Sequence, residues 1–349
     1  MNRLNPAEKT AFYIVMAALL MSVVIPLLFY LTSAFTSDAE NMEFPRRLFP
    51  KFTVTVQVDY IPESGAYEIF YDSGGGYGFE SVLTSNNPSR IKSLFTLQYS
   101  VTKSGEELME DFEITKTQGR QTFVYRKDML YNLRTFFTIA ANARAGLVNS
   151  LIAAALTILI SLSIGSLAGY AMARYTFLFK DQVNVLLLIV RMFPTVGISI
   201  PMAVLLIRMR MFDTLWGLAI LYSIPNIALT AWVTGSIFSG ISRELEEASL
   251  VFGASGAKTF MKITLPMALP ALAASSMYAF LAAWNDTIGA LILTRQNQTL
   301  ALVVYKVIGT NSAGIQYAAA GSLVLILPAL VFTFIIQRYV GQMWGGVNI

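Results

Sequence analysis

The chain has 349 residues, of which 55% are apolar and 13% are charged, about half of the roughly 25% charge typical of soluble domains. It contains no histidine and no cysteine, which excludes disulfides, thiolate chemistry and metal or haem ligation by these side chains. The net charge of +4 is spread without a dense basic patch, so nucleic-acid binding is not expected.

Six apolar runs are long enough to cross a membrane, because about 20 helical residues span the hydrocarbon core. They cover residues 11–31, 150–173, 183–207, 215–238, 266–293 and 318–336. A cleaved signal peptide is the alternative for the first run, which however exceeds the roughly 7–15 apolar residues of such a segment. Lys and Arg in the short loops favour the side of the two termini by eight to four, which predicts cytoplasmic termini.

The segment between the first two runs, residues 36–146, holds 14 acidic and 12 basic residues, and we expect a separate, water-soluble, extracytoplasmic domain. Apolar and polar residues alternate over 52–58 and 95–101, a period of two that is typical of strands with one buried face. The same alternation is less regular over 67–71, 111–116 and 121–126. The pattern predicts a small antiparallel sheet domain.

The most informative stretch lies between the fourth and fifth runs, at residues 240–265. Ser242 is expected to cap a short helix, Glu244 and Glu246 to suit the positive end of its dipole, and Gly253 to end it in the left-handed conformation. Residues at i, i+3, i+4 and i+7 form one face: Leu245, Ala248, Ser249 and Phe252. We predict an amphipathic helix whose face binds in a groove of another protein, an ordinary interfacial loop being the alternative.

A second short helix is expected from Ser255, before Pro266 restarts the chain into the fifth run. The connections are too short to absorb movement. A force on the first short helix would therefore be carried into the fifth run.

This stretch resembles the EAA motif of ABC-importer permeases: Glu247-Ala248-Ser249, three residues, Gly253, nine residues, then Ile263-x-Leu265-Pro266. Ser249 replaces the usual second alanine. About two thirds of the chain is similar to the maltose-type carbohydrate permeases, the MalG-like partner. Further similar positions are Asn149 to Leu151, Arg191 to Pro194, Trp284 to Asp286 and Gln337 to Tyr339. The 36–146 insert departs from that family, as does Asp286, where a glutamate is commoner.

The resemblance implies an all-α polytopic membrane protein with six transmembrane helices, the type I permease fold of ABC importers, plus a small β-rich extracytoplasmic domain between helices 1 and 2. The expected organisation is an N-terminus with the first helix in 1–35, the insert in 36–146, a permease core in 147–341 and a cytoplasmic tail in 342–349. The expected location is the bacterial or archaeal inner membrane.

The resemblance also implies partners: a homologous MalF-like permease, a pair of ATP-binding subunits and an extracytoplasmic solute-binding protein that delivers sugar. ATP and Mg are expected in the partners, and no cofactor, metal or catalytic residue in this chain, since residues 253–259 carry Ala257 where a nucleotide-binding loop needs glycine. Expected ATPase-coupling residues are Glu244, Glu247, Ala248, Ser249, Leu250, Phe252, Gly253 and Ala254. Expected ATPase contacts of the tail are Gln342, Trp344, Gly345 and Gly346.

Polar and aromatic residues inside the runs are candidates for the translocation pathway. Arg191 lies in the third run, where an ionisable side chain costs about 2.5–3.5 kcal/mol, and snorkelling or a structural bond is its alternative role. Its depth differs from that of Asp286, so a direct pair is not expected. Trp284 is either a sugar-stacking residue or an aromatic-belt anchor. The candidate set is Arg191, Tyr278, Trp284, Asn285 and Asp286.

The sequence thus predicts the permease subunit of a binding-protein-dependent ABC importer for a sugar, which forms half of the pathway and couples it to ATP hydrolysis by partners. One alternative is a self-sufficient secondary transporter, which would need more intramembrane ion ligands than Asp286. Another is a membrane-anchored sensor or scaffold whose β domain binds a ligand.

Overall fold

The computed structural model describes residues 6–43, 47–72, 78–309 and 314–340. The chain forms two compact units. One comprises the chain up to Ile139 together with residues 307–324; the other comprises residues 140–306 and the chain from 325 onward.

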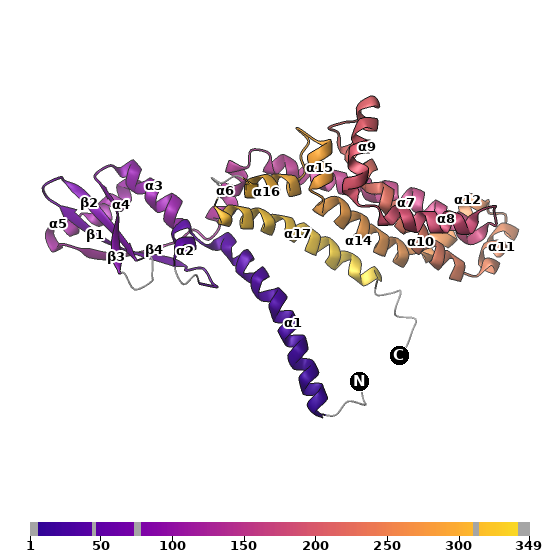
Figure 1. Cartoon of the computed structure of the whole chain (residues 1–349), viewed down its shortest axis with the longest axis horizontal. Coiled ribbons are helices and arrows are strands. Elements are labelled where there is room, and N and C mark those ends of the chain that lie inside the picture. The colour runs from indigo at the N-terminus through magenta and orange to yellow at the C-terminus, as the bar shows by residue number, and fades with distance from the viewer. Residues whose placement is uncertain (1–5, 44–46, 73–77, 310–313, 341–349) are drawn as a thin grey trace. The chain divides into compact units, whose positions relative to one another are not determined.

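The insert contains a four-stranded antiparallel sheet in the order β3-β2-β1-β4 (Figure 1). Its strands are β1 (Thr53–Ile61), β2 (Ala66–Asp72), β3 (Phe79–Ser85) and β4 (Gln121–Arg126). Alternate residues of β1, Val54, Val56 and Val58, are buried in the core, as the period of two predicts. The predicted strands at 52–58, 67–71 and 121–126 are therefore confirmed.

The predicted strand at 95–101 is wrong, because this segment lies mainly in helix α3 (Pro88–Tyr99). Ile91, Phe95 and Tyr99 recur every four residues and are all buried, whereas Leu97 is 54% exposed. A strand would place Leu97 on the same face as Phe95. Asn87 caps the start of the helix, because its side chain accepts a hydrogen bond from the amide of Ser89.

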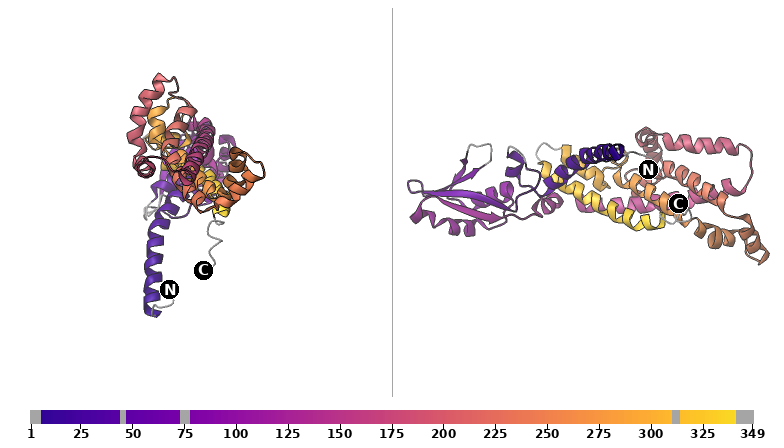
Figure 2. Two further views of the ribbon diagram at one scale, coloured as in Figure 1. Left: turned by 90° about the vertical axis from the view of Figure 1, so that its right-hand side faces the viewer. Right: turned by 90° about the horizontal axis from the view of Figure 1, so that it is seen from below.

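The strand predicted at 111–116 is also wrong, and β3 was not predicted. Residues in this stretch belong to helices α4 (Gly105–Phe112) and α5 (Thr115–Gln118). Ser104 and Glu107 form a reciprocal capping box at the start of α4. Helices α3 and α4 pack their buried residues against the sheet, so the insert is a mixed α/β domain instead of a β-rich one (Figure 2).

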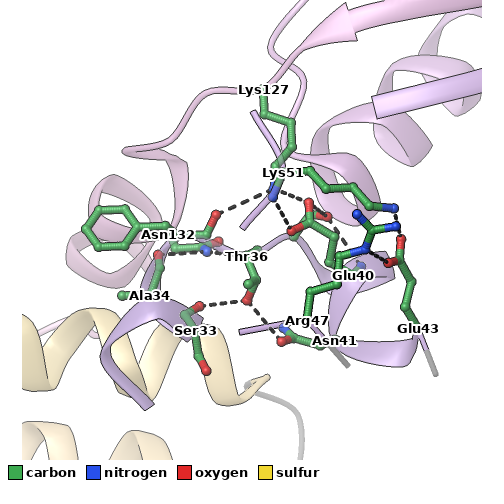
Figure 3. A network of polar contacts seen from close by, with 12 residues as sticks. Ser33, Ala34, Thr36, Glu40, Asn41, Glu43, Arg47, Lys51, Lys127 and Asn132 are labelled. Atoms are coloured by element: carbon green, nitrogen blue, oxygen red, sulfur yellow. Dashed lines mark hydrogen bonds and ion pairs between the residues drawn. The ribbon is translucent and has the colours of Figure 1, made fainter. Parts of the chain in front are cut away.

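A buried polar network joins the end of the first helix to the insert (Figure 3). Helix α1 (Pro6–Thr32) continues into η1 (Ser33–Phe35) and α2 (Asp38–Met42). Lys127, which is fully buried after β4, pairs with Glu40 of α2. Asn132 of α6 (Tyr131–Ile139) donates to the carbonyl oxygens of Ala34, at 3.0 Å, and of Thr36, at 2.7 Å. These bonds fix the insert to the chain that leaves α1.

The second unit consists of helices. They are α7 (Ala143–Arg174), α8 (Lys180–Met192), α9 (Thr195–Arg208), α10 (Leu215–Gly240), α11 (Arg243–Val251), α12 (Gly256–Thr259), the π-helix η2 (Phe260–Thr264), α13 (Leu265–Met267), α14 (Leu269–Asn285) and α15 (Ile288–Leu293). Helices α16 (Leu300–Gly309) and α17 (Ile315–Val340) each contribute residues to both units.

Four helices in the described part of the chain are long and apolar enough to cross a membrane: α1, α7, α10 and α17. The number becomes six if two bent pairs each form one span. The third predicted run bends by 95° between α8 and α9, at Pro194, and the fifth bends by 76° before α14. The fifth run is also shorter than predicted, because α14 ends at Asn285 and α15 is a separate helix.

Helices α7 and α10 approach each other closely through small residues. A Cβ atom added at Gly165 of α7 would lie 2.5 Å from the Cβ of Thr230 in α10. One added at Gly169 would lie 2.7 Å from the carbonyl oxygen of Ala231. No other residue type fits at these two positions at this distance between the helices.

Candidate functional site

Helix α11 and the chain up to α13 form the best defined candidate site. The hydroxyl of Ser242 accepts a hydrogen bond from the amide of Glu244 at 3.3 Å, which caps α11. Gly253 has a φ of 82°, and its amide donates to the carbonyl of Leu250 at 2.9 Å. Ser255 then caps α12 through the amide of Lys258. The predicted beginning and end of the first short helix are confirmed, as is the start of the second.

The apolar side chains of α11 project away from the protein. Leu245 is 45% exposed, Leu250 49%, Val251 85% and Phe252 91%. We call these four residues the apolar tip. Such a cluster of large exposed apolar residues is typical of an interaction surface.

The remaining expected coupling residues surround the apolar tip. Glu244, Glu247, Ala248 and Gly253 are exposed, and Ala254 is half-buried. Ser249 is half-buried as well, because its hydroxyl lies 3.0 Å from that of Thr259 in α12. The structure thus brings the expected set together on one short segment with little cover from the chain itself.

Glu246, the neighbour of the motif glutamate, is the buried carboxylate of α11. Arg174 at the carboxyl end of α7 donates to its Oε1 from Nε at 2.9 Å and from Nη2 at 2.7 Å. Tyr170 donates its hydroxyl to Oε2 at 3.0 Å, and Thr264 donates to Oε1 at 3.0 Å. The side chains of Arg174 and Glu246 are only 7% and 11% exposed.

Burial alone would raise the pKa of Glu246, but the hydrogen bonds from Arg174, Thr264 and Tyr170 outweigh it and hold the pKa below its ordinary value. The carboxylate is therefore charged at neutral pH. Glu246 was not among the expected site residues, since the motif points to Glu247 and Arg174 lies 72 residues away in the sequence.

An aromatic cluster lies beside this ion pair. The ring of Tyr170 lies 5.7 Å from that of Phe238, at the end of α10, and 4.8 Å from that of Phe260 in η2. Phe238, Phe260 and Ala268 form one buried apolar cluster. Three elements thus meet around the base of α11: α7, α10 and the start of the bent pair that ends in α14.

The expected pathway residues do not share one set of contacts. Arg191 of α8 lies over the ring of Tyr278 in α14, 5.8 Å from its centroid. The carboxylate of Asp286 accepts hydrogen bonds from the hydroxyl of Tyr222 at 3.0 Å and from the amide of Ala290 at 3.3 Å. Arg191 and Asp286 thus have different partners, and Asn285 is exposed.

Trp284 is completely buried in the core of the second unit. Its indole nitrogen donates to the carbonyl of Leu325 at 2.9 Å, and its ring stacks on Phe280. In this conformation the indole ring is accessible neither for stacking on a sugar nor for contact with lipid headgroups. The expected tail residues Gln342, Trp344, Gly345 and Gly346 lie outside the described residues.

Sequence reasoning also missed a carboxylate in the loop between α9 and α10. Asp213 accepts hydrogen bonds from three consecutive amides, those of Arg295, Gln296 and Asn297, at 2.8 to 3.2 Å. Burial would raise the pKa of Asp213, but these amides lower it. The loop before α10 is thereby fixed to the loop after α15.

The comparisons with known proteins identify a transport family. The profile described as "Binding-protein-dependent transport system inner membrane component" matches residues 161–344. A putative ABC transporter permease protein of Streptomyces antibioticus, ORF1, is 31% identical over 227 residues, which cover 64% of this chain and 99% of that protein. The maltodextrin transport system permease protein MalD of Streptococcus pneumoniae is 30% identical over 194 residues, 55% of this chain and 69% of that protein.

Among solved structures, a chain of a bacterial ABC transporter involved in the import of the acidic polysaccharide alginate has a similar fold. The TM-score is 0.62 and the sequence identity is 15%. The alignment covers 96% of this chain and 99% of that one, so the similarity of fold includes the insert.

Proposed function

The chain belongs to the family of binding-protein-dependent transport system inner membrane components, and from this membership we propose that it forms half of the translocation pathway of a sugar-importing ABC transporter. It is a permease component and not an enzyme. The proposal of a sugar is supported by the 30% identity to a maltodextrin permease. The partners are a homologous permease, a pair of ATP-hydrolysing subunits and an extracytoplasmic solute-binding protein.

The observation that carries the coupling role is the apolar tip. Phe252 and Val251 are almost fully exposed on a short polar helix that follows a long apolar one. Such residues are not expected to face water without a partner. We infer that α11 lies in the cytoplasm and binds in a groove of an ATP-hydrolysing subunit, as an amphipathic helix does. Glu244 and Glu247, exposed beside the tip, would contact the rim of that groove.

The membrane topology follows from this placement. With α11 in the cytoplasm, six spans place both termini on the same side, and the insert, residues 36–146, lies outside the inner membrane. Its position favours a role in docking the solute-binding protein or in contacting the partner permease. The bent pairs α8–α9 and α12–α14 would line a path that opens alternately to the two sides.

The test is a substitution at the apolar tip in the affinity-purified assembly from native membranes. Phe252→Glu places a charge in the proposed groove, and we expect the ATP-hydrolysing subunits to be lost, with at least about a tenfold drop in ATP hydrolysis per permease, the effect of 1.4 kcal/mol. Phe52→Glu is the matched control, because Phe52 is 71% exposed in the insert. Unchanged hydrolysis in the Phe252 variant would contradict the proposal.

A further inference from the structure

Glu246 is the one carboxylate of α11 that turns inward, toward α7 and η2, away from the proposed partner. Building on the permease function proposed above, we propose that Glu246 is a positioning residue that ties α11 to α7 and to the start of the fifth span at once. Movement of α11 then moves both membrane segments together.

The attachment to α7 has two sides. Arg174 donates hydrogen bonds from two nitrogens to one carboxylate oxygen of Glu246. Its Nη2 also donates to the carbonyl of Ile241, at 3.1 Å. In return Arg243, the first residue of α11, donates to the carbonyl of Arg174 at 3.4 Å. The last turn of α7 and the first turn of α11 are therefore bonded in both directions.

The attachment to the fifth span uses the same carboxylate. Thr264, the last residue of the π-helix η2, is fully buried and donates to Oε1 of Glu246. Pro266 follows two residues later in α13, directly before the bend that leads into α14. One carboxylate thus accepts hydrogen bonds from two membrane segments that are some 90 residues apart in the sequence.

These bonds are strong enough to transmit a movement. Charge-assisted hydrogen bonds are about twice as strong as neutral ones, and burial strengthens them further. Among the described residues, the side-chain hydrogen bonds from α11 to other elements come from Arg243, Glu246 and Ser249. Glu246 contributes the buried, charged ones.

Reciprocal coupling gives a readout that needs no transported solute. α11 cannot then move without α7 and the fifth span. Closure of the ATP-hydrolysing subunits therefore requires these helices to rearrange as well. Without the bonds to Glu246, the ATP-hydrolysing subunits can close without moving these helices. ATP hydrolysis in the absence of solute should then rise, whereas damage to folding or assembly would lower it.

The experiment measures solute-free ATP hydrolysis per assembled complex. Glu246→Gln keeps the size of the side chain and removes its charge, and we expect a rise of at least about fivefold, the lower end of typical coupling. The charge swap Glu246→Arg with Arg174→Glu should bring the rate back toward the wild type. Asp181→Asn, an exposed carboxylate at the start of α8, is the control and should leave the rate unchanged.

An unchanged or lower rate in an assembled Glu246→Gln complex overturns the inference and leaves the permease function intact. The proposed permease function is tested separately: it is contradicted if no ATP-hydrolysing subunit copurifies with the wild-type chain. Should Glu246→Gln not assemble, Tyr170→Phe and Thr264→Val each remove one hydrogen bond and keep the ion pair. A raised rate in either supports the tie, and wild-type rates in both overturn it.

Discussion

The charge of Glu246 depends on the donors that surround it. Arg174 and Tyr170 are the ionisable groups in contact with the carboxylate, and the pKa of Glu246 lies below its ordinary value. A carboxylate with a lowered pKa stabilises the fold fully above its unfolded pKa of about 4.3, and this stabilisation is lost as the pH falls through the lower folded value. The ion pair is therefore complete at neutral pH.

This leads to a prediction for the pH dependence of stability. Glu246→Gln should lower the melting temperature of the solubilised assembly, and the difference from the wild type should be the same at pH 6 and pH 8. Thermal unfolding at the two pH values measures it, with Asp181→Asn as the exposed control. A difference that changes by several degrees between pH 6 and 8 would mean that Glu246 titrates near neutrality, contrary to the geometry.

Asp213 provides a second residue-level prediction. Its φ of 58° is left-handed, which Asn tolerates and Ala does not. Asp213→Ala removes the acceptor of three amides and should cost about 1–3 kcal/mol. Asp213→Asn keeps one acceptor oxygen and the backbone preference, so its effect should be smaller.

Amide hydrogen exchange at Arg295, Gln296 and Asn297 checks this expectation directly. Exchange should accelerate strongly in the alanine variant and modestly in the asparagine variant. Equal protection in both variants and the wild type would show that the carboxylate does not hold this loop.

Residues whose bonding partners are distant in the sequence are the hardest to predict from the sequence. The motif gave the position of α11, its cap at Ser242 and its end at Gly253, since these depend on neighbours in the chain. Glu246 and Asp213 depend on partners about 70 and 80 residues away, which no local pattern reveals. Their roles could be recognised only from the folded structure.

At the level of elements, the packing of α7 on α10 depends on Gly165 and Gly169. We predict that Gly165→Ala destabilises the solubilised chain by about 1–3 kcal/mol, because its Cβ would overlap Thr230. Gly240→Ala, at the end of α10, is the matched control, since nothing lies within 4 Å of the added atom. Thermal unfolding compares the two variants, and equal melting temperatures would contradict the close approach.

The elements also show where periodicity is ambiguous. The run 95–101 alternates like a strand, yet the buried residues Ile91, Phe95 and Tyr99 follow a helical repeat that becomes visible only when the window begins at the Asn87 cap. The strand at 52–58 was predicted correctly because its alternation continues without a competing helical repeat. The long apolar runs are recognisable from their length and Pro194 is a typical position for a kink, but the angle of 95° does not follow from the sequence.

On the scale of the whole molecule, each compact unit has its own buried polar attachment. In the first unit, the buried side chain of Asn132 donates to the carbonyl of Ala34 in η1, and Lys127 pairs with Glu40 in α2, so the insert is bonded to the residues that follow α1. Within the second unit, Glu246 joins α11 to α7 and η2. Both attachments are built from polar bonds that are shielded from water.

The central claim is that the apolar tip lies in a groove of a nucleotide-hydrolysing subunit. The chain has no cysteine, so Val251→Cys introduces a single attachment point for a photoactivatable crosslinker in native membranes. We expect a crosslink to the ATP-hydrolysing subunit, with a yield that changes when ATP is added. A crosslink to an extracytoplasmic protein, or to no protein at all, would contradict it.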